Sequence, residues 1–179
     1  MKLILVRHGQ SETNANNILQ GSNDGGKLTA KGVEQAKKAG KELKEKYKID
    51  MVFCSPLKRA VETLENILIE YPIEGPVFMC KLLEERDYGE YSGLDENLID
   101  WEGLDKESKL NDEMGVESLA ELRKRANLFL EDLKLEEVST VLVVAHGELL
   151  KMIVSILNGK EFGGKDMENA EILVFEEFK

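Results

Sequence analysis

Short apolar segments that alternate with amphipathic helical patterns are the feature that most constrains this fold. Residues 3–6, 49–54, 77–83, 141–145 and 172–175 have the length and the β-branched content of strands. Helical spacing of apolar residues fills most of the intervals between them. Because helices in such alternating chains cover both faces of a sheet, the sequence predicts an α/β fold. We expect a three-layer sandwich with a mostly parallel five-stranded sheet flanked by helices.

Four helices are expected from their start signals. Thr29 is a candidate N-cap, Pro56 suits the first turn of a second helix, and further helices begin near Ser118 and after Gly147. The apolar positions expected to face inward are Val33, Ala36, Gly40, Leu43, Ala60, Leu64, Ile67, Leu68, Leu119, Leu122, Ala126, Phe129, Leu133, Leu150, Ile153, Val154 and Leu157.

The length of 179 residues and the 42% apolar content fit a single domain over residues 1–179. No repeat or Pro-rich linker divides the chain. Residues 90–116 are predicted to form an acidic cap or an excursion over the sheet, because residues 95–116 have weak periodicity and only two basic residues, both lysines. The acids in that stretch are Asp95, Glu96, Asp100, Glu102, Asp105, Glu107, Asp112 and Glu113.

Charge and hydropathy exclude several classes of function. The net charge of −11 opposes nonspecific binding to nucleic acid or to an anionic membrane. No apolar run reaches the roughly 18 residues of a membrane span, and the zones of a secretory signal are absent, so we expect a cytoplasmic protein. Cys54 and Cys80 lack Cys-x-x-Cys spacing and are predicted to be structural buried thiols.

The two histidines of the chain share one pattern. His8 and His146 each follow an apolar strand and precede a glycine. Ligands in open α/β sheets gather beyond the carboxyl ends of the strands, so both imidazoles are expected at one functional edge. Gly9 and Gly147 would allow backbone or ligand to approach closely.

Arginine is scarce, with five residues against nineteen lysines. A guanidinium group binds two phosphate oxygens at once, so the positions of these few residues are informative. Arg7 adjoins His8, and Arg59 lies one turn beyond Pro56, near a helix N-terminus that itself attracts anions. Spacing alone would equally fit Arg59 as a surface arginine on a helix.

The motifs resemble those of the histidine phosphatase superfamily, also called phosphoglycerate mutase-like. That family carries Arg-His-Gly directly after its first strand, as residues 7–9 do here within Arg-His-Gly-Gln-Ser-Glu-Thr-Asn. Further segments appear in family order at residues 20–21, 28–29, 55–60, 83–89, 117–118 and 146–147. The resemblance therefore spans most of the chain and implies the phosphoglycerate mutase-like fold.

The resemblance implies a role for each matching residue. His8 would be the nucleophile that becomes phosphohistidine, Arg7 and Arg59 would straddle the transferred phosphoryl group, and His146 would donate a hydrogen bond to it. The other residues expected to contact substrate are Asn14, Ser11, Gln20, Gly21, Tyr88 and Gly147. No metal and no cofactor is expected.

Hydrolysis also needs a carboxyl group with a raised pKa, which first protonates the leaving oxygen and then activates water. The family places this acid four residues before a glycine, here Gly89, which selects Glu85 over its neighbour Glu84. The alternative is a solvated acidic pair. Glu148 is expected near the mouth of the site, either as a helix-start residue that interacts with the dipole or as a substrate contact.

The expected activity is hydrolysis of a phosphomonoester, with a small phosphorylated metabolite as substrate. Relatives that are mutases usually carry basic residues after the Tyr-Gly segment, whereas residues 95–116 are acidic and would repel a second anionic group. Phosphoglycerate mutase-type transfer and a protein phosphatase acting on phosphohistidine or phosphotyrosine remain as alternatives, as does a binding module without activity. The sequence predicts no oligomeric state.

Overall fold

The computed structural model describes residues 1–106 and 108–178, so Glu107 of the acidic stretch lies outside the described residues. Within them the chain forms one five-stranded sheet of order β3-β2-β4-β1-β5. The strands are β1 (Lys2–Arg7), β2 (Met51–Cys54), β3 (Val77–Met79), β4 (Thr140–Ala145) and β5 (Ile172–Phe175). Only β5 is antiparallel to its neighbour, β1. The prediction of a mostly parallel α/β sheet is confirmed.

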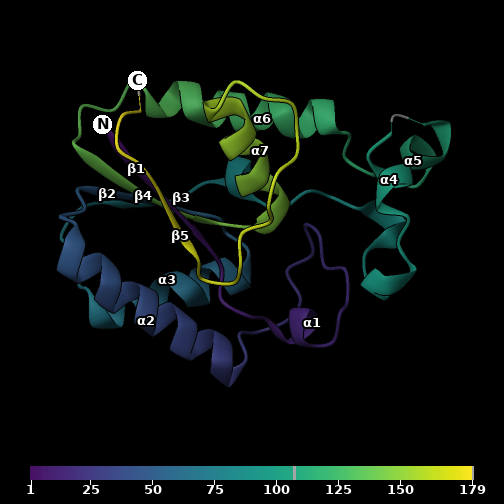
Figure 1. Ribbon diagram of the computed structural model, residues 1–179. Coiled ribbons are helices and arrows are strands. Elements are labelled where there is room, and N and C mark those ends of the chain that lie inside the picture. The colour runs from purple at the N-terminus through teal and green to yellow at the C-terminus, as the bar shows by residue number, and fades with distance from the viewer. Residues whose placement is uncertain (107, 179) are drawn as a thin grey trace.

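Helices cover both faces of this sheet (Figure 1). The pair α2 (Ala30–Lys46) and α3 (Lys58–Glu70) lies on one face, and α6 (Leu119–Leu133) and α7 (Gly147–Leu157) lie on the other. Side chains alternate along β1, so that Ile4 and Val6 pack toward α2 and α3 while Leu3 and Leu5 pack toward α6 and α7. Two apolar cores therefore sandwich the sheet, in the three layers that the sequence predicts.

Local capping signals place the helix starts. The Thr29 hydroxyl accepts the N–H of Gly32, and Ser118 forms a reciprocal capping box with Glu121. The helix expected near Pro56 begins two residues later, at Lys58. The expected inward residues are largely buried, with Val33 and Leu68 among those that are only half-buried.

The third strand is shorter than predicted. Its last ladder bond runs from the Cys80 N–H to the Cys54 carbonyl at 2.8 Å, after which residues Lys81–Leu83 turn in a 3-10 helix. Strand β3 lies at the sheet edge and its three residues are exposed, so packing does not extend it. Cys80 is half-buried for the same reason, while Cys54 is buried, and both thiols are free.

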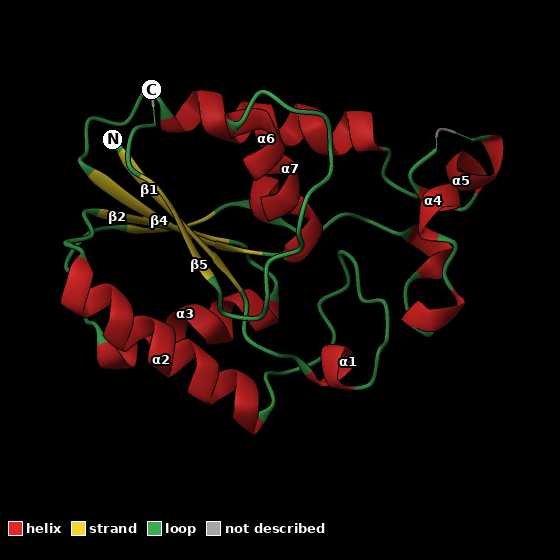
Figure 2. Ribbon diagram, in the orientation of Figure 1, coloured by secondary structure: helices red, strands yellow, loops and turns green. Residues whose placement is uncertain are grey.

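The acidic excursion forms short helical turns. It comprises η2 (Gly89–Tyr91), η3 (Glu96–Leu98), α4 (Trp101–Leu104) and α5 (Lys109–Glu113). Figure 2 shows these turns beside the sheet, on the side of the molecule where β1 and β4 end, and not over one of its faces. They therefore adjoin the edge at which both histidines emerge.

Arg86 joins this excursion to the body of the protein. Its guanidinium is fully buried, with Nη1 2.6 Å from the Asp105 carboxylate and Nη2 and Nε donating to the carbonyls of Leu104 and Glu117. A small apolar cluster supports the same junction, formed by Leu19, Tyr88, Leu104 and Val116. Across the described part of the chain, no helix combines the length and apolarity needed to cross a membrane.

Candidate active site

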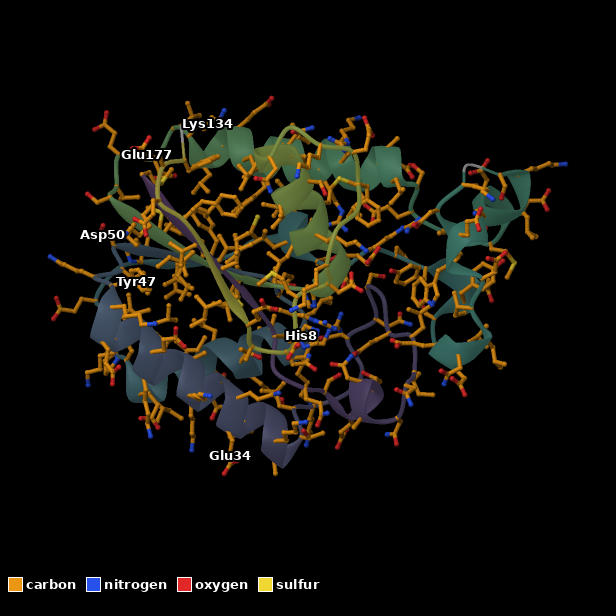
Figure 3. The ribbon with its side chains drawn as sticks, viewed as in Figure 1. His8, Glu34, Tyr47, Asp50, Lys134 and Glu177 are labelled. Atoms are coloured by element: carbon orange, nitrogen blue, oxygen red, sulfur yellow. The ribbon has the colours of Figure 1, made fainter. Side chains whose placement is uncertain are left out.

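The two histidines meet because β1 and β4 are parallel neighbours in register. Arg7 pairs with Ala145, so the next residue on each strand is a histidine. The ring centroids of His8 and His146 lie 5.2 Å apart, and both side chains are buried. In Figure 3 His8 lies inside the molecule, where the chain leaves β1 and enters the segment that carries α1 (Glu12–Ala15).

His8 is held as a neutral imidazole with a defined tautomer. Its Nδ1 lies 2.7 Å from the Gly9 carbonyl oxygen, which can only accept, so Nδ1 carries the proton and Nε2 keeps its lone pair. Burial lowers the pKa of His8 well below its ordinary value, and the charges of Arg59 and Arg7 lower it further. Nε2 is therefore available as a nucleophile at neutral pH.

His146 has one bonded and one free ring nitrogen. Nε2 lies 2.7 Å from the Ser55 hydroxyl, while Nδ1 is buried without a hydrogen-bond partner among the described residues. Burial lowers the pKa of His146 well below its ordinary value, with Arg59 and His8 adding to the effect. When the Ser55 hydroxyl donates to Nε2, the proton of the neutral ring is on Nδ1 and can be donated to an anion.

Arg59 comes from the first turn of α3 and is almost fully buried. Its Nη1 and Nη2 donate to the carbonyls of Asn23 and Gly21 at 3.0 and 2.7 Å. Burial lowers its pKa to about 10, against the opposing effects of Glu85 and Asp24. The group therefore stays cationic at neutral pH in a fixed orientation.

Arg7 is the second cation. Its Nη1 donates to the Met167 carbonyl, while Nε is buried without a hydrogen-bond partner within the described residues. The guanidinium lies against Gly147, where a Cβ would be in van der Waals contact with the Arg7 Cζ atom at 3.4 Å. An anion bound between the two arginines would supply the partner that Nε lacks.

These groups surround a cavity of about 170 Å³. Nine of the eleven site residues expected from the sequence line it: Arg7, His8, Asn14, Gln20, Gly21, Arg59, Glu85, Tyr88 and Gly147. His146 lies behind His8 and does not line the cavity. Ser11 is also absent from its walls, because its hydroxyl caps α1 by accepting the N–H of Asn14 at 3.2 Å.

Glu85 is placed at the cavity by backbone groups at the start of α7. Its Oε1 accepts the N–H groups of Arg86 and Leu149 at 2.9 and 3.1 Å, and its Oε2 accepts that of Glu148 at 3.2 Å. Oε2 therefore has a single donor, which leaves a lone pair of this oxygen free for proton transfer. Glu84 lines a different, larger cleft.

That larger cleft, of about 580 Å³, lies against the other side of Glu85. It contains no histidine, and its lining includes Lys81 and Arg125 among many acids. It lacks a nucleophile of the kind found in the smaller cavity. The 170 Å³ cavity is therefore the candidate active site.

The sequence did not indicate several residues of the cavity wall. Glu96 and Trp101 come from the acidic excursion, and Asp166 comes from the glycine-containing loop before β5. Glu148, for which two roles were open, also lines the cavity. The composition of residues 95–116 indicated an acidic cover in general, but no periodic signal indicated which of its acids face the site.

The arrangement suits a tetrahedral anion. Two guanidinium groups can stabilise negative charge on its oxygens, and a neutral imidazole can attack its centre. Within the described residues, no three His, Cys, Asp or Glu side chains form a group that could hold a metal ion. The protein groups alone thus supply a nucleophile, a positive field and a carboxyl group.

Comparison with known proteins identifies the family of the chain. Residues 3–177 match the family model of the histidine phosphatase superfamily, branch 1. A 2,3-bisphosphoglycerate-dependent phosphoglycerate mutase of Mesorhizobium japonicum is 35% identical, and the match covers 95% of this chain and 86% of that protein. The enzyme of the same name from Methylobacterium radiotolerans is 38% identical, and the match covers 88% of this chain and 79% of that protein. A phosphoserine phosphatase of Entamoeba histolytica, solved with 3-phosphoglyceric acid, superposes with a TM-score of 0.76 at 28% identity, covering 97% of this chain and 89% of that one. The chain belongs to the histidine phosphatase superfamily.

Proposed function

We propose that this protein is a phosphomonoesterase that hydrolyses small phosphorylated metabolites through a phosphohistidine on His8. The observation that carries the proposal is the convergence of Arg7, His8 and Arg59 on one small cavity, with His146 against His8 and Glu85 in the wall. Each of these groups has a distinct task in phosphoryl transfer.

The reaction follows in two steps. His8 Nε2 forms a bond to phosphorus as the ester P–O bond breaks, while Glu85 gives a proton to the leaving alcohol oxygen. Glu85 then takes a proton from water as the water oxygen attacks phosphorus and the P–N bond breaks. Arg7, Arg59 and His146 stabilise the charge on the equatorial oxygens in both steps.

The test is release of inorganic phosphate from p-nitrophenyl phosphate by the wild type and His8→Ala. We expect activity in the wild type, loss of at least about a thousandfold in the variant, and an acid-labile, base-stable phosphoenzyme after a rapid quench. Activity should persist in EDTA, because the proposed chemistry uses no metal. A phosphoenzyme on serine or cysteine, or full activity of His8→Ala, would overturn the proposal.

Phosphoglycerate mutase activity is a second candidate, because the relatives from Mesorhizobium japonicum and Methylobacterium radiotolerans carry that name. The acids Glu96, Glu148 and Asp166 at the cavity weigh against it, since a mutase must hold a second anionic group there. Incubation with 3-phosphoglycerate and 2,3-bisphosphoglycerate separates the two. Formation of 2-phosphoglycerate faster than inorganic phosphate would establish the mutase.

The proposed location is the cytoplasm, in keeping with two free thiols, Cys54 and Cys80, in the folded chain.

A further inference from the structure

The candidate active site is electrically polarised. Its two arginines lie beside His8, whereas four carboxyl groups also line the same cavity: Glu85, Glu96, Glu148 and Asp166. Glu85 has three backbone donors and a proposed catalytic task. The other three have no such task, so their placement around a phosphate-binding cavity calls for a different function.

Glu148 has only distant cationic partners. The nearest cationic nitrogens, Lys151 Nζ and Arg86 Nη1, lie 3.6 and 4.0 Å from its oxygens. Each cation has a closer partner, since Lys151 lies 2.9 Å from Asp166 and Arg86 lies 2.6 Å from Asp105. The side chain of Glu148 is only 20% exposed, so water compensates its charge poorly.

The electrostatics of the cavity agree with this geometry. Burial raises the pKa of Glu148 to about 7, and the neighbouring charge of Glu85 adds to the rise. Burial likewise raises the pKa of Glu96. A cationic group bound at this part of the cavity would therefore stabilise the ionised carboxylate of Glu148.

A separate observation concerns a hydrogen-bond donor in the same cavity that a ligand oxygen would satisfy. Gln20 lines it and is only 8% exposed, and its Nε2 has no hydrogen-bond partner among the described residues. Its Oε1 is held by the Thr13 hydroxyl, which leaves the amide nitrogen as a donor to be satisfied. A phosphoryl or ester oxygen would satisfy it.

We infer that the preferred substrates are phosphomonoesters whose alcohol portion carries an ammonium group. Glu148 receives this group, with Glu96 and Asp166 in the same cavity wall, while the phosphoryl group lies between Arg7 and Arg59. This inference rests on the proposed phosphatase activity. It assigns Glu148 as a specificity-determining residue and predicts poor turnover of phosphomonoesters whose alcohol portion carries a second anion.

Three two-carbon phosphomonoesters test the inference: O-phosphoethanolamine with an ammonium group, 2-hydroxyethyl phosphate with a hydroxyl group, and 2-phosphoglycolate with a carboxylate. The measured quantity is the ratio of kcat/KM for the ammonium ester to that for the hydroxyl ester. Glu148→Gln should lower this ratio on the order of tenfold, the scale of one charge-assisted hydrogen bond. Comparing the ratio between wild type and variant cancels the intrinsic reactivity of the esters.

The matched control is Glu113→Gln, which removes the same charge from an acid on α5 whose side chain is 63% exposed. It should leave the ratio unchanged. Asp166→Asn provides a second variant on an exposed side chain, and should also lower the ratio, because it frees Lys151 to pair with Glu148.

The outcomes separate the two proposals. An equal ratio in the wild type and both cavity variants overturns the inference, as does faster turnover of 2-phosphoglycolate than of O-phosphoethanolamine by the wild type. Hydrolysis of p-nitrophenyl phosphate without turnover of the ammonium ester leaves the phosphatase activity standing and also overturns the inference. Failure to hydrolyse any of the four esters overturns the phosphatase proposal itself.

Discussion

Replacement of Glu148 by Gln should stabilise the protein above about pH 4.5, with the full gain above pH 7. This carboxyl group ionises near pH 4.5 when solvated, but burial raises its pKa to about 7 in the folded chain. Between these values the unfolded chain has lost the proton while the folded chain retains it. The free energy of unfolding therefore falls as pH rises from 4.5 through 7.

The size of the effect follows from the same two values. They differ by about 2.5, and one pKa unit corresponds to about 1.4 kcal/mol, so the ionised carboxylate costs the folded wild type on the order of 3 kcal/mol above pH 7. A glutamine fills the same space and does not titrate. The free energy of unfolding of Glu148→Gln should thus match the wild type below pH 4.5 and exceed it by roughly 3 kcal/mol at pH 8.

Urea unfolding followed by circular dichroism at pH 5 and pH 8 measures this difference directly. Glu113→Gln is the control, because it changes an exposed side chain. The difference in free energy of unfolding between this variant and the wild type should be the same at both pH values. A stability gain of Glu148→Gln that is the same at both pH values would refute the reasoning, and so would a variant less stable than the wild type at pH 8.

Three further predictions concern the site and its support. Ser55→Ala should lower kcat on the order of tenfold with little change in KM, because the hydroxyl fixes the proton of His146, and Ser55→Thr should restore kcat. The kcat profile of Glu148→Gln, which lacks the carboxyl group of pKa about 7, should show no loss as the pH falls through 6.5, because burial lowers the pKa of His8 well below that value; a step there would contradict it. Arg86→Ala should lower the free energy of unfolding by about 2 to 5 kcal/mol, because it leaves a cavity and removes the donors to the carbonyls of Leu104 and Glu117, and it should expose residues 89–116 to limited proteolysis.

Local signals predicted the scaffold well. Thr29 and Ser118 cap helices where expected, because an N-cap is determined by residues within one turn. The strands ending at Arg7 and Ala145 were expected from apolar runs, and their adjacency follows from the parallel register. Strand β3 was over-extended in the prediction, because hydrophobic length alone does not reveal that the strand lies at an exposed edge.

The wall of the cavity was harder to predict, because non-local contacts build it. Asp166 reaches the site from a loop without periodicity, and Glu96 depends on how the excursion is held by the bonds of Arg86. Ser11 shows the converse error: a residue within the matching motif serves as a helix cap and not as a cavity contact. A motif identifies which residues occur together, while side-chain direction decides which of them face the ligand.

The charges of Glu85 and of the arginines in the site compensate one another. Burial, together with the two guanidinium groups beside it, keeps the imidazole of His8 neutral, but burying Arg59 without a counter-charge would destabilise the free enzyme. Glu85 opposes that cost, since its charge raises the pKa of Arg59 against the effect of burial. When a phosphoryl dianion enters, it takes over this compensation, so the negative charge of Glu85 becomes the less favourable neighbour. Under the proposed mechanism, Glu85 then makes the proton transfers of both steps beside a phosphoryl group whose charge Arg7 and Arg59 neutralise.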